Sequence, residues 1–288
     1  MAARPRTLPA AVAPVLVGTT AAVEASDEVR YGAFVAALVG SIFIQIGTNL
    51  ANDYSDAKRG ADSVDRLGPV RVTASGLVAP RRVLVATWVA FAVAVAAGAY
   101  LTAVAGPVIL VVGVASILAG VLYTGGPRPY GYEGLGEAFV FLFFGLVAVN
   151  GSYFVQVERL DWLPFALSLP VGFLSTAILV VNNVRDIDTD RRAGKRTLAV
   201  RLGRHRARGL YSGLIAGAYI GLPVALGAAD GPAWGLLALG SLPLVLRPLQ
   251  AVRTRTDGAA LNAALAGTGA VLAAFSLLLA AGLLLATA

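Results

Sequence analysis

Long apolar runs separated by short polar segments make up almost the whole chain. The runs suited to crossing a membrane are residues 8–23, 31–52, 83–104, 107–124, 138–155, 162–181, 209–229, 232–246 and 259–287. The hydrocarbon core of a bilayer takes about 20 apolar residues in helical form. Because the runs do not alternate and lipid offers the backbone no hydrogen-bond partners, each run is predicted to be a helix. The first and eighth runs are short, so the prediction is nine spans with an error of one.

The composition supports the same class of protein. Hydrophobic residues make up 57% of the 288 residues, charged residues only 14%, and the mean hydropathy is +0.76. These values exclude a soluble domain and predict an all-α polytopic membrane protein, with residues 1–288 forming a single transmembrane domain. The chain has no cysteine and one histidine, His205, which argues against disulfides, thiolate metal sites and zinc sites.

The basic residues predict the orientation in the membrane. With the N-terminus in the cytoplasm, the cytoplasmic segments are 1–7, 53–82, 125–137, 182–208 and 247–258. These segments hold 21 of the 23 Lys and Arg residues and leave only Arg30 and Arg159 outside, in agreement with the positive-inside rule. The net charge of +7 therefore reflects topology and attraction to anionic lipid or substrate, and it gives no support to nucleic-acid binding. The predicted location is the plasma membrane.

A charged stretch, residues 182–203, follows the sixth apolar run. It places Asp186, Asp188 and Asp190 within five residues, and basic residues follow at once. Carboxylates this close repel one another unless they share a cation. Oxygen ligands of this kind suit Mg²⁺, which binds one or two carboxylates and completes its shell with water and substrate phosphates. The alternative is a solvated acidic loop without a metal.

A second, similar stretch at residues 52–62 follows the second apolar run. The two stretches share the pattern N-[DN]-x-x-D, which aligns Asn52 with Asn182 and Asp56 with Asp186. Side chains four residues apart lie on one face of a helix. Two matched polar clusters on the same side of the membrane indicate an internal repeat whose halves form one site.

Further candidate residues lie near these two motifs. Polar groups inside an apolar span usually face the bundle interior, so Gln45 and Asn49 are predicted to line a cavity. The bases around the first motif suit a phosphate site, because Lys and Arg bind phosphate oxygens strongly. A glycine- and proline-rich turn, 123–132, contains three tyrosines and Arg128. The aromatic run that begins at Phe139 either faces lipid or forms the wall of a pocket for an apolar chain or a carbocation.

Three blocks of sequence carry a further signal. They are NLANDYSDAKRGAD followed by RLGPVR, then YTGGPRPYGYEGLGEAFVFLFFGLVAVNGSYF, then NNVRDIDTDRRAGKRTLAVRLG. Together with the opening RPRTLPAAVAPVLVG, they make residues 4–203 similar to the UbiA-type membrane prenyltransferases, and most similar to the menaquinone-pathway branch of that family. The rest of the chain matches only as further apolar helices.

The resemblance implies nine transmembrane helices around a central cavity, with the active site on the cytoplasmic side. It also implies Mg²⁺-dependent transfer of a polyprenyl group from polyprenyl diphosphate to 1,4-dihydroxy-2-naphthoate, with loss of carbon dioxide. The residues that match those holding Mg²⁺–diphosphate are Asn52, Asp56, Asp186 and Asp190. Asp53 and Asp62 are expected to assist them. The first motif of the wider superfamily has a third acid where this chain has Gly60, and Asp62 is expected to replace it as a metal ligand.

The same resemblance indicates which residues contact the substrates. The bases expected near the departing diphosphate, where positive charge stabilises the leaving group, are Lys58, Arg66, Arg71, Arg128, Lys195 and Arg201. Arg66, Arg71 and Lys195 are the preferred members of this set. Tyr123 joins Gln45 and Asn49 as a candidate for substrate binding, and Arg4 or Arg6 is the candidate for the acceptor carboxylate.

Other functions stay open on the sequence alone. The acceptor is either dihydroxynaphthoate or a homogentisate- or hydroxybenzoate-type compound. A membrane phosphotransferase is disfavoured because its D-x-x-D-G-x-x-A-R block is absent. A transporter of phosphate-bearing lipid would be expected to place its acids at mid-membrane rather than at helix ends. The prenyl chain length and the oligomeric state are not determined by the sequence.

Overall fold

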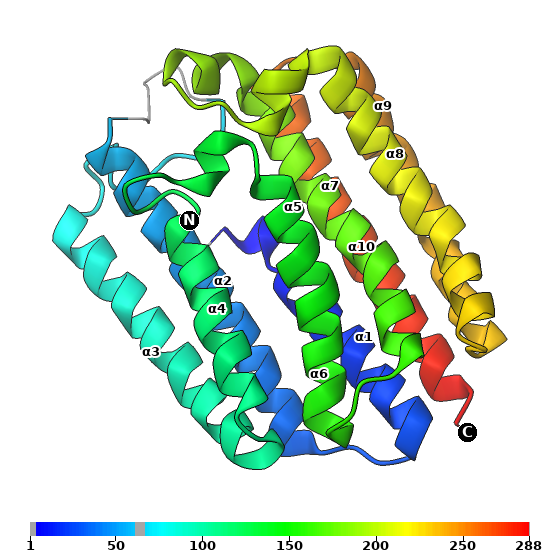
Figure 1. Ribbon diagram of the computed structural model, residues 1–288. Coiled ribbons are helices and arrows are strands. Elements are labelled where there is room, and N and C mark those ends of the chain that lie inside the picture. The colour runs from blue at the N-terminus through cyan, green and yellow to red at the C-terminus, as the bar shows by residue number, and fades with distance from the viewer. Residues whose placement is uncertain (1–3, 61–66, 288) are drawn as a thin grey trace.

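The computed structural model (Figure 1) describes residues 4–60 and 67–287, and within these it contains helices and turns but no β-strand. A short 3₁₀ turn, η1 (Pro5–Thr7), comes first. The helices that follow are α1 (Pro9–Ser26), α2 (Tyr31–Lys58), α3 (Pro80–Ala105), α4 (Val108–Leu122), α5 (Gly136–Val140), the π-helix η3 (Phe141–Val147), α6 (Ala148–Val157), α7 (Trp162–Arg192), α8 (Leu198–Ala228), the 3₁₀ helix η4 (Ala233–Val245), α9 (Leu246–Thr254) and α10 (Gly258–Leu285). Another 3₁₀ turn, η2 (Tyr130–Glu133), precedes α5. The predicted all-α class is confirmed.

Each of the nine predicted apolar runs coincides with a helix. Among the described residues, eight helical stretches are long and apolar enough to cross a membrane, and α4 is a shorter apolar helix. Two of the eight are composite, since α5, η3 and α6 are continuous and η4 continues into α9. The short helix is the fourth rather than the first or eighth, because those two extend past their apolar runs to Pro5–Ser26 and Ala233–Thr254.

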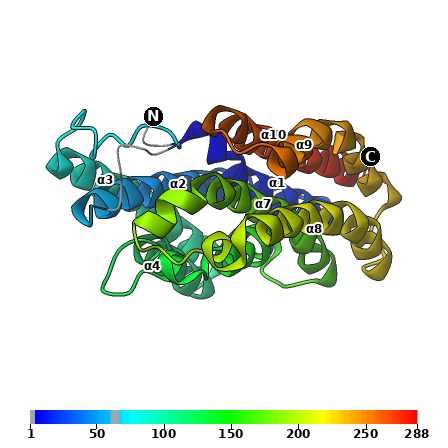
Figure 2. The same cartoon turned by 90° about the horizontal axis from the view of Figure 1, so that it is seen from above.

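The most buried span, α7, lies inside the bundle and supports the second motif. It packs against α8, α10, α1 and η3. Figure 1 shows α3 at one side of the bundle and α8 and α9 at the opposite side, and Figure 2 shows the same arrangement from above. Fully buried apolar side chains such as Leu167, Leu174 and Leu272 join α7 and α10 to one hydrophobic core. This packing makes α7 a rigid support.

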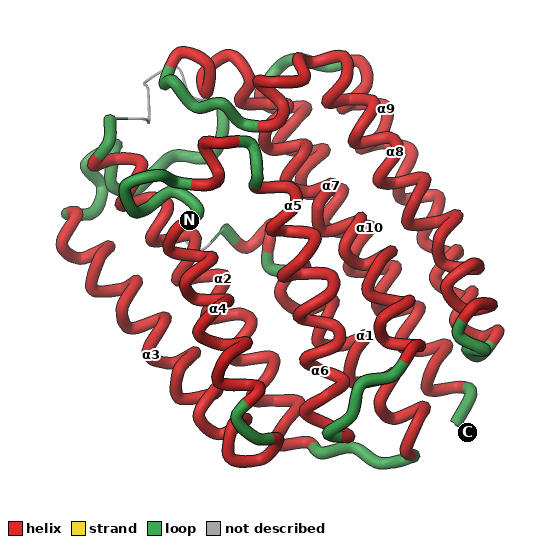
Figure 3. The backbone as a smooth tube through the Cα atoms, viewed as in Figure 1, coloured by secondary structure: helices red, strands yellow, loops and turns green. Residues whose placement is uncertain are grey.

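The two motifs lie at the same end of the bundle. Figure 3 shows the longer connections gathered at that end, the upper one in the view. Helix α2 continues to Lys58 and α7 continues to Arg192, past the ends of the predicted apolar runs. Asp53, Asp56, Asp186 and Asp190 therefore lie on the last turns of helices rather than in loops. Because the acids are helical, the spacing of four within each motif keeps its polar side chains on one face.

The span formed by α5, η3 and α6 approaches α7 very closely at Gly145. A Cβ atom on Gly145 would lie 2.7 Å from the Cα of Gly172 and 3.0 Å from the carbonyl oxygen of Ser168. A residue without a side chain is therefore needed at this contact. The contact falls within the π-helical turn η3, and such turns are frequent at functional sites. The same turn carries Phe143 and Phe144, which line the cavity described below.

Candidate active site

A cavity of about 430 Å³ opens between the motif-bearing ends of α2 and α7. Its polar wall contains residues of both motifs, namely Asn52, Asp56, Asn182, Asn183, Asp186 and Asp190. Side chains of α3, α4 and the α5–α6 span supply most of its apolar walls. Two stretches that are far apart in the sequence therefore face one space, as a single shared site requires.

Asp56 is the centre of the first half of the site and is only 1% exposed. Its Oδ2 accepts hydrogen bonds from Arg71 Nη2 at 2.8 Å and from Lys195 Nζ at 3.2 Å. Its Oδ1 accepts one from the Tyr132 hydroxyl at 2.6 Å. A buried carboxylate needs such partners, because an unpaired charge is costly to remove from water. Arg71 and Lys195 also line the cavity, so both cations are in reach of an anion bound there.

Lys195 is brought over the cavity by the turn that ends α7. Gly194 has a φ of 73°, which glycine adopts without strain. The backbone N–H of Lys195 then donates to the carbonyl of Asp190 at 2.9 Å, which is the long hydrogen bond of a Schellman turn. The N–H of Arg196 donates to the carbonyl of Tyr132 at 2.9 Å. The Lys195 ammonium lies 4.7 Å from the centroid of the Tyr132 ring, so the two side chains meet directly.

Asp53 fixes the segment that presents Arg71. The Asp53 side chain is buried but is not part of the cavity wall. Its oxygens accept the backbone N–H of Thr73 at 2.9 Å and that of Val72 at 3.2 Å. The sequence predicted that Asp53 assists the residues that hold Mg²⁺–diphosphate. Its contacts are those of a residue that positions the neighbouring base.

Two motif asparagines connect the cavity wall to neighbouring elements. The Asn52 Oδ1 accepts a hydrogen bond from the Thr124 hydroxyl at 2.8 Å, just after α4. The Asn183 Nδ2 donates to Glu137 of α5 at 2.9 Å. All four side chains are buried. These bonds fix the orientation of each amide, and an amide oxygen has a second lone pair with which to bind a cation.

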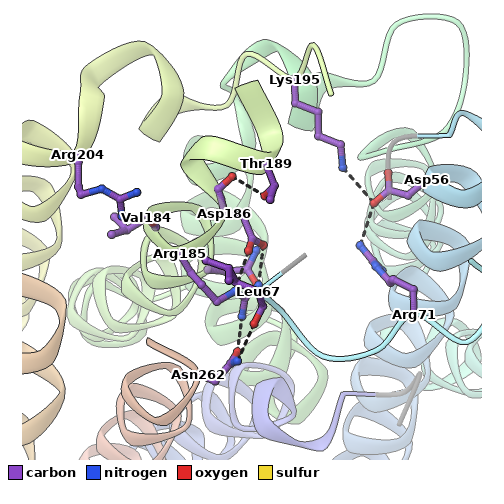
Figure 4. Close-up of polar contacts among 11 residues, drawn as sticks. Asp56, Leu67, Arg71, Val184, Arg185, Asp186, Thr189, Lys195, Arg204 and Asn262 are labelled. Carbon is purple, nitrogen blue, oxygen red and sulfur yellow. Dashed lines mark hydrogen bonds and ion pairs between the residues drawn. The ribbon is translucent and has the colours of Figure 1, made fainter. Parts of the chain in front are cut away.

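The second half of the site is built around Arg185 and Asp186 (Figure 4). Arg185 is 1% exposed, and its Nε and Nη2 donate to the two carboxylate oxygens of Asp186 at 2.8 and 2.6 Å. Nη2 also donates to Asn182 Oδ1 at 2.8 Å, and Nη1 donates to Asn262 Oδ1 of α10 at 2.7 Å. Asp186 and Asn182 line the cavity and Arg185 does not. The guanidinium therefore binds both side chains on the side away from the cavity.

The donors around the cavity suit a hard divalent cation. The metal ligands proposed from the sequence that lie in the cavity wall offer only carboxylate and amide oxygens. Within residues 4–60 and 67–287, no three His, Cys, Asp or Glu side chains are grouped closely enough to hold a metal by themselves. This arrangement fits Mg²⁺, which takes one or two carboxylates from a protein and completes its shell with water and phosphate oxygens.

Most of the predicted site residues are brought to this cavity. Those in its wall are Gln45, Asn49, Asn52, Asp56, Arg71, Tyr123, Asp186, Asp190 and Lys195. Arg4 also lies in the wall, whereas Arg6 does not. Asp62 and Arg66 lie outside the residues that the structure describes.

Three predicted bases are not in the cavity wall. Lys58 is exposed at the end of α2, and the side chain of Arg128 is 84% exposed. Arg201 forms an ion pair with Glu133 at 3.3 Å on the surface. Proximity in sequence suggested these residues. Lys58 follows Asp56 by two residues, about 200° around α2, and Arg128 lies in a turn whose geometry the sequence pattern does not specify.

Other residues of the site were not predicted. The sequence identified Tyr132 only as part of the turn 123–132, and it assigned Arg185 no role in the second motif. Asn262 lies in an apolar run where no chemistry was expected. The amide side chain could have identified Asn262 from the sequence, because a polar group in a membrane span is costly unless it faces a partner.

A row of aromatic rings leads from the polar wall into the apolar part of the cavity. Tyr123 meets Tyr130 edge to face with centroids 5.4 Å apart, and Tyr130 stacks on Phe139 at 4.0 Å. Phe139 stacks in turn on Phe143 at 6.1 Å. Burial raises the pKa of Tyr130, so its hydroxyl stays protonated. Aromatic faces beside an apolar space suit an unsaturated chain or a carbocation.

Sequence comparison finds one family and a set of close relatives. Residues 11–266 match the model of the UbiA prenyltransferase family. The chain is 45% identical over 281 residues to a 1,4-dihydroxy-2-naphthoate octaprenyltransferase of Mycobacterium tuberculosis, covering 98% of this chain and 94% of that protein. It is 38% identical over 270 residues to the Escherichia coli protein of the same name, covering 90% and 86%.

Solved structures show the same fold. UbiA homologues from Aeropyrum pernix and Archaeoglobus fulgidus match with TM-scores of 0.69 and 0.67 at 15% and 17% identity. Each match covers 98% of this chain and 97% of the other. The Archaeoglobus fulgidus homologue bound to GPP and Mg²⁺ matches with a TM-score of 0.64 at 14% identity, covering 96% and 97%.

Proposed function

This chain belongs to the UbiA prenyltransferase family, and on that premise we propose that it transfers a polyprenyl group from polyprenyl diphosphate to 1,4-dihydroxy-2-naphthoate. The products are diphosphate, carbon dioxide and a demethylmenaquinol, which makes the enzyme part of menaquinone biosynthesis. The protein is a multi-pass membrane enzyme. The observation that supports this function best is the meeting of both motifs, Arg71 and Lys195 at the polar wall of one apolar cavity.

The polar wall is suited to hold the diphosphate group. Arg71 and Lys195 both contact Asp56 and both face the cavity. Since each carries several N–H donors, each can bind a phosphate oxygen while it remains near the carboxylate. Tyr132 places a further hydroxyl on the same carboxylate. These groups stabilise the negative charge that develops on diphosphate as it departs.

The reaction balances without a further reagent. The bond between the allylic carbon and the diphosphate oxygen breaks, and its electron pair stays on the diphosphate. The electron-rich naphthalene carbon that carries the carboxylate then attacks the allylic cation and forms the new carbon–carbon bond. Loss of carbon dioxide returns an electron pair to the ring and restores its aromaticity. The apolar walls of the cavity reduce the access of water to the cation, and the row from Tyr123 to Phe143 faces it with aromatic rings.

Mg²⁺ is the cofactor that fits the oxygen donors of the two motifs. The residues that would hold it are Asn52, Asp56, Asp186 and Asp190, with Asp62 as a further candidate. Bound Mg²⁺ supplies Lewis-acid stabilisation of the phosphate oxygens. Arg185 contributes by fixing the orientation of the Asp186 carboxylate.

We assign the dihydroxynaphthoate acceptor to the side of the cavity formed by the N-terminal segment and α2. Arg4 lies in this wall, and Gln45 and Asn49 are buried in it, about two turns and one turn before Asn52 respectively. The Gln45 amide donates to the Thr7 hydroxyl at 3.2 Å, which joins the N-terminal segment to α2. Arg4 is therefore the base assigned to the acceptor carboxylate, and the amides are assigned to its hydroxyl groups.

The end of the bundle that carries the motifs is assigned to the cytoplasm, on the positive-inside pattern. The absence of native cysteine allows a direct test with Arg128→Cys and Arg159→Cys, which lie at opposite ends of the bundle. In intact cells, a membrane-impermeant maleimide is expected to label the Arg159→Cys variant only. Labelling of Arg128→Cys before permeabilisation would reverse the assigned orientation.

An acceptor assay tests the function itself. Membranes containing the protein are incubated with labelled polyprenyl diphosphate and with dihydroxynaphthoate, homogentisate or hydroxybenzoate in turn. Prenylated product is expected with dihydroxynaphthoate and with Mg²⁺, and none is expected when a chelator is present in excess. Product with one of the other acceptors alone would contradict the assigned substrate. A protein that moved lipid without releasing diphosphate would be a transporter.

A further inference from the structure

The contact between Arg185 and Asp186 cannot be maintained by helix geometry alone. Successive residues of an α-helix point about 100° apart, so neighbouring side chains do not face each other. Arg185 nevertheless binds both carboxylate oxygens of Asp186 at 2.8 and 2.6 Å. The guanidinium must therefore bend along the helix surface, and other groups must hold it in that position.

Asn262 of α10 is one of those groups. Its Oδ1 accepts a hydrogen bond from Arg185 Nη1 at 2.7 Å, on the side of the guanidinium away from Asp186 (Figure 4). Asn182 Oδ1, one turn earlier in α7, accepts from Nη2 at 2.8 Å. Asn182 belongs to the same helix as Arg185, whereas Asn262 belongs to α10, so Asn262 ties the guanidinium to a second helix.

The other end of the Asn262 amide contacts the segment that leads to Arg71 in the first half of the site. Its Nδ2 donates to the carbonyl oxygen of Leu67 at 2.9 Å. Leu67 also packs against the start of α10, where a Cβ on Gly258 would lie 3.0 Å from the Leu67 carbonyl oxygen. The chain from Leu67 leads within four residues to Arg71, which binds Asp56 at 2.8 Å. One amide thus joins the Arg185–Asp186 pair to the segment that carries Arg71.

We propose that Asn262 is a positioning residue that holds the two halves of the diphosphate site in register, through Arg185 on one side and Leu67 on the other. Asn262 is not in the cavity wall and contacts neither substrate space nor reacting atoms. Its effect passes through the orientation of Asp186 and Arg71. The inference rests on the proposed function, because it assumes that these side chains bind Mg²⁺ and diphosphate.

The test compares Asn262→Leu with a matched control on the same helix, Thr268→Val. Thr268 is fully buried and hydrogen-bonds Tyr211 at 2.9 Å, but it does not line the cavity. Both variants lose a polar contact of α10, but only Asn262→Leu loses the hydrogen bonds to Arg185 and Leu67. The two readouts are the Mg²⁺ concentration at half-maximal rate and the rise in melting temperature caused by Mg²⁺ with inorganic diphosphate in purified protein.

Asn262→Leu is expected to raise the half-saturating Mg²⁺ concentration about 10- to 100-fold, as is typical when a group that orients a metal ligand is lost. It should also remove most of the ligand-induced rise in melting temperature. Thr268→Val should lower the melting temperature without ligand and keep both ligand responses. Asn262→Asp, which keeps the acceptor for Arg185, should retain more of the response than Asn262→Leu.

The outcomes separate this inference from the function on which it rests. If the wild type gains no stability from Mg²⁺ with diphosphate, the proposed site is wrong, and the inference is overturned with it. If the wild type responds and Asn262→Leu responds equally, only the inference is overturned. If Asn262→Asp is no better than Asn262→Leu, Arg185 is not the route through which Asn262 acts.

Discussion

Asp186→Asn is expected to lower the rate of prenyl transfer by at least about 100-fold. The substitution removes a carboxylate charge from the cavity wall, at a residue that the proposed function assigns to Mg²⁺, and metal-assisted charge stabilisation contributes several kcal/mol. Each 1.36 kcal/mol corresponds to a factor of ten in rate. The rate is measured with dihydroxynaphthoate and saturating polyprenyl diphosphate, at matched amounts of protein in the membrane.

The matched control is Asp188→Asn, two residues along the same helix. Asp188 is exposed, pairs with Arg204 at 2.8 Å and is not in the cavity wall. Its loss should leave the rate within about twofold of the wild type, because surface ion pairs contribute little. A similar loss of rate in both variants would mean that the total negative charge of the segment matters, and that the position of Asp186 does not.

Asp186→Asn also leaves the buried Arg185 without its charged partner, which is itself destabilising. A variant that removes both charges, Arg185→Gln with Asp186→Asn, separates the two effects. Because a neutral pair is tolerated better than a half-removed ion pair, this protein should recover stability while its activity stays low. Recovery of activity together with stability would show that Asp186 serves the fold only.

Loss of either motif is expected to cost nearly as much as loss of both. The comparison is Asp56→Asn, Asp190→Asn and the double variant. If the two acids serve one bound diphosphate, the rate of the double variant should lie close to that of the slower single variant, since residues that act as a unit are not additive. Release of inorganic diphosphate and formation of prenylated product are measured together.

Both readouts should fall in parallel, because ionisation precedes attack by the ring. If the two single losses multiply in the double variant, the motifs act independently and the shared site is refuted. If diphosphate release continues while product disappears, the acids serve the acceptor instead of the leaving group. Either result would be clear only at matched expression, so each variant is quantified in the membrane first.

The fold class and the positions of the spans were predictable because they depend on local physics. A continuous apolar run in lipid must be helical, so all nine runs coincide with helices. The ends of the helices were less predictable. Helices α2 and α7 continue beyond their apolar runs because backbone hydrogen bonds do not require apolar side chains once the helix has left the hydrocarbon.

The polar wall was predictable in part, for a similar reason. The spacing of four places Asn52 with Asp56, and Asp186 with Asp190, on one face of their helices whatever the rest of the chain does. The direction of the flanking bases has no such local rule. Arg71 reaches Asp56 where Asp53 holds the backbone of the next two residues, Val72 and Thr73, whereas Arg128 in another loop points to solvent.

By itself, the sequence determined the membrane class, the family resemblance, the helices and which acidic and amide side chains share a helix face, since each follows from composition or from spacing within one segment. Only the tertiary structure decided which cations meet those ligands. The Schellman turn at Gly194 positions Lys195 so that it donates to Asp56, and the packing of α10 against α7 places Asn262 in contact with Arg185. Contacts of this kind depend on how helices pack and how loops close, and no periodicity within a single segment specifies them.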